Sequence, residues 1–580
     1  MLKTSICLIA SLFLCAAAQA AVLYVSTAAE NDGNGTREQP FRSIQSALDK
    51  ARPGDTVELA PGIYRERVRF RSGGKFQKPI RLNGPREAVI DASEDIPLNW
   101  LPAPEAGPLA YRAAVSRPVY SVTCPEGTVI ILNERRVTPG LPETVGTKTD
   151  RQGTKWIWDW KHNLRCGVGR YGWEAVKALA MYRRKSGELY LAFGNGRDPR
   201  KIAVTVSPKE AAVTIDGADW CVVSGITIRN AWYGVLLSDT FGSTVENCRI
   251  ERTDFGVQMI EGARQCTVRF CDISYDPLAS ADPHEKGSWD IWQAHKTGGF
   301  YDRIGVNMLR TSGGHRIHDN YIHDHWGGIQ DTGEAGQNGG LEVHHNRIHN
   351  ISDDGLEPDG AEENCRWYSN VVSRSLCGFR IKCVRKGPLY AYGNLFFQNK
   401  EDFRNFGTKN LAKAIVYVYF NTSTSRAAVK NNAVPPHIGT PNYHYFNNIF
   451  YCEHLFVPER PDLAAPDWQE KGNLFIRRGK NPLWERNRQE AAKRNFGKNS
   501  RYLTDVSPGF RNEALQDFSI TADSPARNAG ADISMYGLPG LDTFLRKDGS
   551  SDAGALPFGT PMLCVPRSPE AVRAPPAGFF

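Results

Sequence analysis

Four charged residues in the second half of the chain could form one reactive site. Glu357 and Asp359 stand two residues apart, and Arg380 and Lys382 repeat that spacing 23 residues later. Two further acids, Asp353 and Asp354, come shortly before the first pair. Carboxylates and cations held close together are the groups that acid–base catalysis and transition-state stabilisation require. This chemistry needs a fold that stacks residues about one repeat apart.

The chain contains a repeat of the required length. Asparagine recurs with steps of 26, 24, 24, 27 and 26 residues, at Asn320, Asn346, Asn370, Asn394, Asn421 and Asn447. After each comes a short turn and then an alternation of apolar and polar residues. A fixed period in this range indicates a solenoid, and alternation of period two indicates strands. We therefore predict an all-β fold, a right-handed parallel β-helix with a continuous apolar interior.

Aligning the repeats shows which side chains share a face. Because strand side chains alternate, the residue after each inward apolar residue faces outward. Stacked strands lie ~4.8 Å apart, so the four charged residues are predicted to form one compact patch, with Asp353 and Asp354 in the turn that leads to it. One outward column runs through Leu236, Gln258, Asn307, Gln330, Glu357, Arg380 and Arg404, and a second through Ser238, Ile260, Leu309, Thr332, Asp359 and Lys382.

The segment "SDDGLEPDG", followed one repeat later by "CGFRIK", resembles the pattern of calcium-dependent pectate lyases with β-helix folds. The resemblance implies Ca²⁺ as cofactor, bound by Asp353, Asp354 and Glu357, with Asp331 as a fourth ligand. In that family a Lys after Gly-Phe is the base. Here that position holds Arg380, and Glu357 replaces the family's Asp; Lys382 faces the same way.

The chemistry of β-elimination supports the same residues independently. Removing a proton beside a uronate carboxylate requires a base and a cation that stabilises the developing charge. Oxygen-rich clusters suit calcium. Arginine is nearly always protonated and lysine is easier to tune, so both Arg380 and Lys382 remain candidates for the base. The first prediction is an exported enzyme that cleaves a polysaccharide, in particular a uronate-containing one, by β-elimination.

Two alternatives remain open. Glu357 and Asp359 have Cα atoms ~6.6 Å apart on one strand, a spacing that suits the carboxylate pair of a glycoside hydrolase. The chain could also be a polysaccharide-binding β-helix without catalysis, with its charges forming cross-strand ion pairs only. The concentration of ionisable groups on adjacent repeats favours an enzyme.

Other residues are predicted to assist. His325 is a candidate proton donor, and Gln330, Arg404 and Trp326 are candidate substrate contacts. A long loop near 275–301 adds Trp289 and Trp292, since long loops on a regular scaffold are usually functional. Several further histidines cluster beside the patch in a spacing that matches no recognised zinc signature: His315, His318, His323, His344, His345 and His349.

The chain divides into five parts. Residues 1–20 read as a signal peptide, which predicts a secreted or periplasmic protein. Residues 21–97 hold an N-terminal cap, with a short helix where Phe41, Ile44, Leu48 and Ala51 have helical spacing, and the first rungs. Residues 98–205 are predicted to be an inserted β-rich module, 206–454 the main β-helix with the catalytic groove, and 455–580 irregular rungs and a C-terminal cap.

Composition adds little about partners. The formal charge of +8 becomes +7 without Lys3, which is compatible with an acidic polysaccharide. No motif indicates nucleic-acid binding, no later apolar run reaches the ~20 residues of a membrane span, and a monomer is expected. Eleven of the 13 Cys follow the signal peptide. Cys248, Cys266, Cys271, Cys365, Cys377 and Cys383 fall where small interior residues are expected, and export would permit disulfides without indicating any pairing.

Overall fold

The structure is a computed structural model. It describes residues 20–563 and 565, except 105–109, 120, 125–126, 133–144, 150–154, 160–163, 170–177, 194–195, 276–301, 334–335, 361–362, 383, 406–413, 432–441, 459–467, 494–496, 547–549 and 564. The signal peptide through residue 19, the loop near 275–301 with Trp289 and Trp292, and Cys383 therefore lie outside the described residues.

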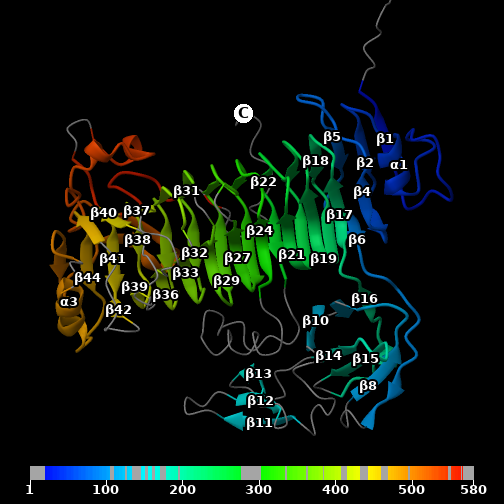
Figure 1. Ribbon diagram of the computed structural model, residues 1–580, viewed down its shortest axis with the longest axis horizontal. Helices are drawn as coiled ribbons and strands as arrows, with labels where there is room; N and C mark the ends of the chain where they lie inside the picture. The colour runs from blue at the N-terminus through cyan, green and yellow to red at the C-terminus, as the bar shows by residue number, and fades with distance from the viewer. Residues whose placement is uncertain are drawn as a thin grey trace, which may run out of the picture.

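The chain forms a right-handed parallel β-helix, as predicted (Figure 1). Each turn contributes strands to three faces, which we call sheets 1, 2 and 3. Sheet 1 contains β1 (Val22–Val25), β2 (Thr56–Leu59), β5 (Ile80–Asn83), β18 (Cys221–Ser224), β20 (Thr244–Glu246), β22 (Thr267–Arg269), β25 (Arg316–His318), β28 (Glu342–His344), β31 (Cys365–Tyr368), β34 (Leu389–Tyr392), β37 (Ile415–Tyr419), β40 (Asn442–Phe446) and β43 (Trp468–Lys471).

Sheets 2 and 3 are joined through two long strands, β19 (Thr227–Ser238) and β21 (Arg249–Met259), which run along both faces. Sheet 2 also contains β3 (Gly62–Tyr64), β6 (Ala88–Asp91), β23 (Asp272–Ser274), β26 (Tyr321–His325), β29 (Arg347–Ile351), β32 (Val371–Ser373), β35 (Leu395–Phe397), β38 (Thr422–Ser423), β41 (Ile449–Cys452), β44 (Leu474–Arg477) and β45 (Arg501–Leu503). Sheet 3 also contains β4 (Val68–Phe70), β17 (Ala211–Asp216), β24 (Ile304–Leu309), β27 (Gly327–Thr332), β30 (Asp354–Pro358), β33 (Cys377–Ile381), β36 (Glu401–Asn405), β39 (Ala427–Asn431) and β42 (His454–Pro458).

The interior of the solenoid is apolar and continuous. The predicted inward residues of sheet 3 are all fully buried: Val235, Val257, Val306, Ile329, Leu356, Phe379 and Phe403. A glycine precedes all of them except Phe403, and it has a steric reason, because an added Cβ would strike a side chain of sheet 2. At Gly355 that Cβ would lie 2.4 Å from Cγ1 of Val372, and at Gly328 it would lie 2.8 Å from Cγ2 of Ile348. The repeat therefore fixes how closely sheets 2 and 3 meet.

The recurring asparagines form a hydrogen-bonded stack in the corner between sheets 1 and 2. Each buried amide donates to the asparagine of the next rung, as Asn346 does to Asn370 Oδ1 at 3.0 Å, and accepts a hydrogen bond from the rung before. The register of asparagines read from the sequence is wrong at one position. Asn448 continues the stack from Asn421, whereas Asn447 has a positive φ of 55° and binds Ala531 of the C-terminal segment. Two adjacent asparagines made the register ambiguous.

A short helix covers the N-terminal end, as predicted. The side chain of Ser43 caps helix α1 (Ile44–Lys50) at its N-terminus, and Glu66 accepts from the N–H of Ile44 at 2.8 Å. Phe41, Ile44 and Leu48 are buried against the first rungs.

The chain leaves the solenoid after β6 and returns at β17. The β-rich insertion is confirmed, and Figure 1 shows it at one side of the solenoid. It has one seven-stranded sheet, of β7 (Leu101–Pro102), β8 (Ala110–Ala114), β9 (Ser121–Cys124), β10 (Gly127–Leu132), β14 (Ala178–Arg183), β15 (Glu188–Phe193) and β16 (Thr205–Ser207), with 3₁₀ helix η3 (Pro199–Lys201). A three-stranded sheet contains β11 (Val145–Thr149), β12 (Lys155–Asp159) and β13 (Leu164–Gly169).

The C-terminal segment packs back on the solenoid. It contains α3 (Trp484–Lys493), β46 (Phe510–Asn512), β47 (Asp517–Ile520) and 3₁₀ helices η5 (Glu513–Leu515), η6 (Ser534–Tyr536) and η7 (Leu541–Thr543). Leu541 and Phe544 cover aromatic residues of sheet 1 that include Tyr392 and Tyr419.

Eight cysteines of the described residues are buried. They are Cys124, Cys221, Cys248, Cys266, Cys271, Cys365, Cys377 and Cys452. Among the described helices, none is long and apolar enough to cross a membrane.

Candidate functional site

The two predicted outward columns are present on sheet 3. Strand register pairs Gln258 with Asn307, Asn307 with Gln330 and Gln330 with Glu357. Arg380 pairs with Arg404 one rung further on. The side chains of Gln258 and Asn307 are hydrogen-bonded at 3.0 Å. The register therefore stacks residues that stand 23 to 27 positions apart in the chain, or 49 where the loop near 275–301 intervenes.

Glu357, Asp359, Arg380 and Lys382 come together as predicted, and Asp354 joins them. Arg380 Nε lies 2.9 Å from Asp354 Oδ2, and its Nη2 contacts Glu357 Oε1 and lies 3.6 Å from Asp359 Oδ2. Lys382 Nζ lies 3.0 Å from Asp359 Oδ2. One guanidinium is thus shared by three carboxylates.

Arg404 extends this group by one rung. Its guanidinium contacts Glu401 and lies 3.9 Å from Asp354 Oδ1. Glu401 was not among the predicted site residues, although its register offered a signal: it aligns with Cys377, which aligns with Asp354. We call the set Asp353, Asp354, Glu357, Asp359, Arg380, Lys382, Glu401 and Arg404 the charged cluster.

Asp353 occupies the turn before β30, as predicted. Its N–H donates to the carbonyl oxygen of Trp326 at 2.8 Å, and its carbonyl accepts from Leu376 at 2.9 Å. These bonds fix the backbone between the corner and the first residue of the strand, Asp354.

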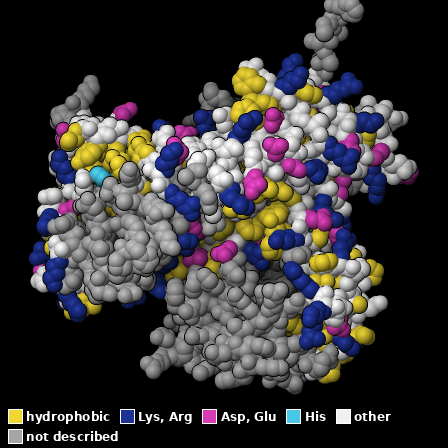
Figure 2. Space-filling model, in the orientation of Figure 1, with side chains coloured by type: hydrophobic (Ala, Val, Ile, Leu, Met, Phe, Trp, Pro, Cys, Tyr) yellow, Lys and Arg dark blue, Asp and Glu magenta, His cyan; other side chains and the backbone are white. Residues whose placement is uncertain are grey.

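The charged cluster is partly buried and acidic. Its five carboxylate residues are at most 8% exposed, whereas the side chains of Arg380 and Lys382 are 15% and 36% exposed. Five carboxylates face three cations, so the cluster has a formal charge of −2 when all groups are ionised. Figure 2 shows acidic and basic side chains interspersed on the face viewed, around a hydrophobic patch over the solenoid.

The structure does not bring Asp331 into the charged cluster. Asp331 aligns with Met308, an interior residue, and faces away from Gln330. It is fully buried and accepts a hydrogen bond from Asn338 Nδ2. Its Oδ2 also lies close to Gly360, since a Cβ added to that glycine would be only 2.3 Å away. The alternation of side chains along β27 explains this placement.

The residues present do not fit the calcium site that the family resemblance implies. Asp331 faces the interior, and the cation that Asp354 and Glu357 contact is the guanidinium of Arg380. Within the described chain, three ligand atoms of different residues gather within 4.8 Å of one another at His318, Asp319 and His344 only, on sheet 1.

His325 and Trp326 lie in the corner between β26 and β27. Each is 1% exposed. His325 Nδ1 accepts from the N–H of Trp326 at 3.1 Å and lies 3.0 Å from the carbonyl oxygen of Arg303. Its ring is 5.7 Å from that of Tyr275. In this structure neither side chain reaches the surface, in contrast to the predicted roles in proton donation and substrate contact.

Another buried acid, Asp254, lies on the same side of the solenoid. Asp254 Oδ1 is 2.8 Å from Nε of Arg303, whose guanidinium stands 4.1 Å above the ring of Trp232. Burial raises the pKa of Asp254 to about 6, against the opposing effect of Arg303. It lies three rungs from Glu357, ~14 Å, which is too far for the two to act as one carboxylate pair.

Comparisons with known proteins agree on the fold. A family model described as a protein of unknown function, DUF1565, matches residues 27–83. The uncharacterized protein YwoF of Bacillus subtilis (strain 168) is 36% identical over 75 residues, which are 13% of this chain and 16% of the relative. The match spans a small part of that protein.

Two solved structures are similar over most of the chain. XylC, solved in complex with xylose, has a TM-score of 0.51 and 15% identity, over 84% of this chain and 87% of XylC. The pectate lyase Pel9A has a TM-score of 0.42 and 12% identity, over 93% of this chain and 96% of Pel9A. The resemblance to β-helix proteins inferred from the sequence is thus confirmed at the level of the fold.

Proposed function

We propose that the protein is a carbohydrate-active enzyme that cleaves a glycan at the charged cluster of sheet 3. The observation that carries the proposal is the convergence of Asp354, Glu357 and Asp359 on Arg380, on two adjacent rungs. Charged groups of both signs in a partly buried patch are the arrangement that acid–base catalysis uses. The fold is compatible with this role, because XylC was solved with a bound sugar.

Among the reactions considered, the ion pairs favour glycoside hydrolysis over β-elimination. A lyase needs a cation to neutralise the uronate carboxylate. Arg380 and Lys382 are instead engaged by carboxylates of the protein, and the cluster as a whole is negative. A neutral glycan approaches such a surface without the repulsion that a uronate polymer would meet.

Glu357 and Asp359 are the proposed carboxylate pair. They are two residues apart, so their Cα atoms lie ~6.6 Å apart, and carboxyl separations of roughly 5–9.5 Å serve retaining or inverting hydrolases. One carboxyl group donates a proton to the leaving oxygen while the other acts as nucleophile or as base toward water. Arg380 contacts both and positions them. Gln330, next to Glu357 on β27, is the proposed substrate contact.

We propose that this activity is exerted outside the cytoplasm, because residues 1–20 are predicted to be a signal peptide. A β-eliminating lyase with Lys382 as base is the second candidate. It is favoured by the exposure of Lys382 at the edge of the cluster.

The reaction type can be tested with a panel of neutral and uronate-containing polysaccharides, each with and without EDTA. We expect new reducing ends from a neutral glycan, no absorbance near 235 nm, and no effect of EDTA. A calcium-dependent rise in absorbance at that wavelength would contradict hydrolysis and establish the lyase. Binding without cleavage of any polymer would contradict both reactions.

A further inference from the structure

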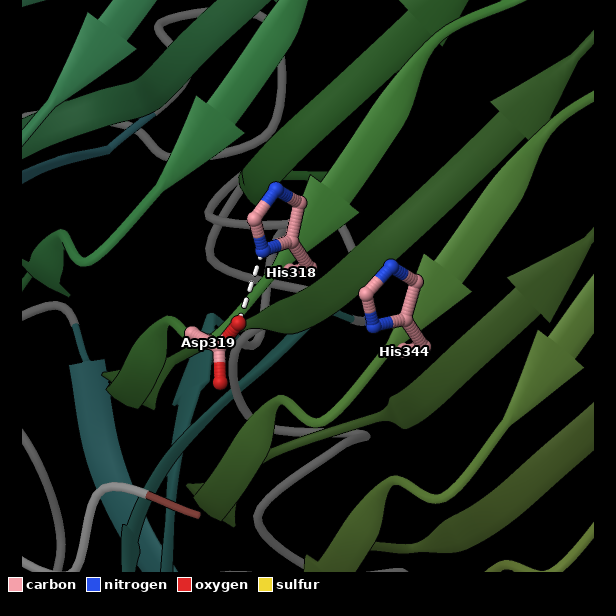
Figure 3. Close-up of side chains that lie close together, drawn as sticks. All are labelled: His318, Asp319 and His344. Carbon is pink, nitrogen blue, oxygen red and sulfur yellow. Dashed lines mark hydrogen bonds and ion pairs between the residues drawn. The ribbon is translucent and has the colours of Figure 1, made fainter. Parts of the chain in front are cut away.

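Two histidines and one aspartate of sheet 1 lie close enough to share a metal ion. His318 ends β25, His344 ends β28, and the two are register partners. Asp319 follows His318, and one ligand atom of each of the three residues lies within 4.8 Å of the others. Figure 3 shows the two imidazole rings side by side, with the Asp319 carboxylate turned toward His318. His318 Nδ1 lies 2.7 Å from Asp319 Oδ2.

His345 supplies a fourth donor beside this group. Its Nδ1 lies 2.9 Å from Nδ1 of His344. Asp319 and His345 occupy the same corner position of successive rungs, and both have positive φ, 55° and 54°. Each of two adjacent rungs therefore presents a pair of donors, the last residue of the strand and the corner residue that follows it.

The contact between the two histidine nitrogens has a chemical consequence. Two imidazole nitrogens at hydrogen-bond distance share one proton, so at least one of them presents a lone pair. Nitrogen ligands of one tetrahedral Zn²⁺ lie ~3.3 Å apart, given Zn–N bonds of ~2.0–2.1 Å. The separations within the two donor pairs, 2.7 and 2.9 Å, are near this value. Ligand atoms of His318, Asp319 and His344 lie within 4.8 Å of one another, so binding of one ion draws them together by at most about 1.5 Å.

Stacked and edge-on rings hold the histidines in place. His318 and His344 stack with centroids 4.8 Å apart, and Tyr368 continues the stack at 4.7 Å. Tyr392 and Tyr419 extend the same column. The site remains open to solvent, since the side chains of His318 and Asp319 are 15% and 29% exposed.

We propose that His318, Asp319, His344 and His345 bind one divalent transition metal ion of the class typified by Zn²⁺. Three imidazole nitrogens and one carboxylate oxygen are a ligand set that such ions prefer. The ion ties the rung of β25 to the rung of β28. It lies on sheet 1, whereas the charged cluster lies on sheet 3, so it stabilises the solenoid and takes no part in cleavage.

The test uses tag-free full-length protein treated with EDTA. Calorimetric titration with Zn²⁺ is expected to show one tight site, and Zn²⁺ is expected to raise Tm because it binds the folded chain. His344→Tyr removes one donor and keeps the stack, since tyrosine already fills the next three positions of the column. This variant should keep the metal-free Tm, lose the Zn²⁺-dependent rise, and bind Zn²⁺ more than about 10-fold more weakly.

Asp319→Asn is a second variant that changes a single ligand atom and should weaken binding in the same direction. His349→Gln is the matched control, because His349 lies on sheet 2 and contacts Ser373 Oγ at 2.9 Å. It should bind Zn²⁺ as the wild type does. Equal Zn²⁺ affinity of the wild type, His344→Tyr and Asp319→Asn would overturn the proposal, as would a wild type whose Tm does not respond to Zn²⁺.

Discussion

The asparagine stack and the charged cluster are two columns of one solenoid with opposite patterns. In the stack, each rung repeats the same residue, because an amide both donates and accepts and so satisfies its copy on the next rung. In the column of the charged cluster the residue changes from Gln330 to Glu357 to Arg380, and only the step from Arg380 to Arg404 repeats a residue. Like charges on adjacent rungs repel, and the carboxylates of Asp354 and Glu401 lie beside the two arginines. Repetition along a column therefore indicates structure, and variation between charged types indicates chemistry.

Disrupting the asparagine stack should lower stability more than disrupting the charged cluster does. Asn370→Ala leaves buried donors and acceptors on both neighbouring rungs without partners, including the carbonyl of Val343. Each unsatisfied group costs about 1–3 kcal/mol, so the free energy of unfolding should fall by about 4 kcal/mol. Chemical denaturation measures this, with the exposed Asn31→Ala as control. A loss below about 1 kcal/mol would show that the stack is dispensable.

Sheet 2 offers a charged group that serves structure and not catalysis. Burial alone would lower the pKa of His323, but hydrogen bonds to Asp272 and Asp324 raise it to about 9. Because the folded pKa exceeds the unfolded value of ~6.5, this stabilisation is fully present below that pH and disappears as the pH rises through about 9.

The corresponding measurement compares the wild type with His323→Gln by denaturation across pH. The wild type should be more stable by about 3 kcal/mol at pH ~6, with the difference shrinking toward pH ~10. Cleavage at the charged cluster should be unchanged. A stability difference that is the same at both pH values would contradict the assigned role of this histidine.

The smallest of the three effects on stability concerns the glycines that precede the inward residues of sheet 3. Gly355→Ala places a Cβ 2.4 Å from Cγ1 of Val372, and such overpacking costs about 2 kcal/mol. Gly339→Ala is a control in which the nearest atom is 3.4 Å away. Thermal melts of the two variants should differ. Equal Tm values would mean that the junction of sheets 2 and 3 adapts freely.

Much of this architecture could be predicted from the sequence. The period of the asparagines fixes the rung length, and strand alternation then places Glu357, Asp359, Arg380 and Lys382 together. The same alternation, applied to Asp331, would have shown that it faces inward beside Gln330. The family resemblance pointed to it as a ligand instead. The sequence could not show whether Asn447 or Asn448 belongs to the asparagine stack. That depends on which of the two residues adopts the left-handed backbone conformation at the corner.

Other features required the structure. The burial of His325 follows from its contacts with the backbone of Arg303 and the ring of Tyr275, which belong to earlier segments of the chain. The histidines of the proposed metal site match no spacing signature, since their grouping arises from two rungs and from the backbone at Asp319 and His345.

The most direct test of the account is the effect of Glu357→Gln on kcat/KM for the best substrate of the polysaccharide panel. Acid–base groups contribute 10²–10⁴-fold, so we predict a decrease of about that size with an unchanged Tm. Glu342→Gln, an ion-paired glutamate of sheet 1, should cleave as the wild type does. Full activity of Glu357→Gln would contradict the central claim that the charged cluster of sheet 3 is the catalytic site.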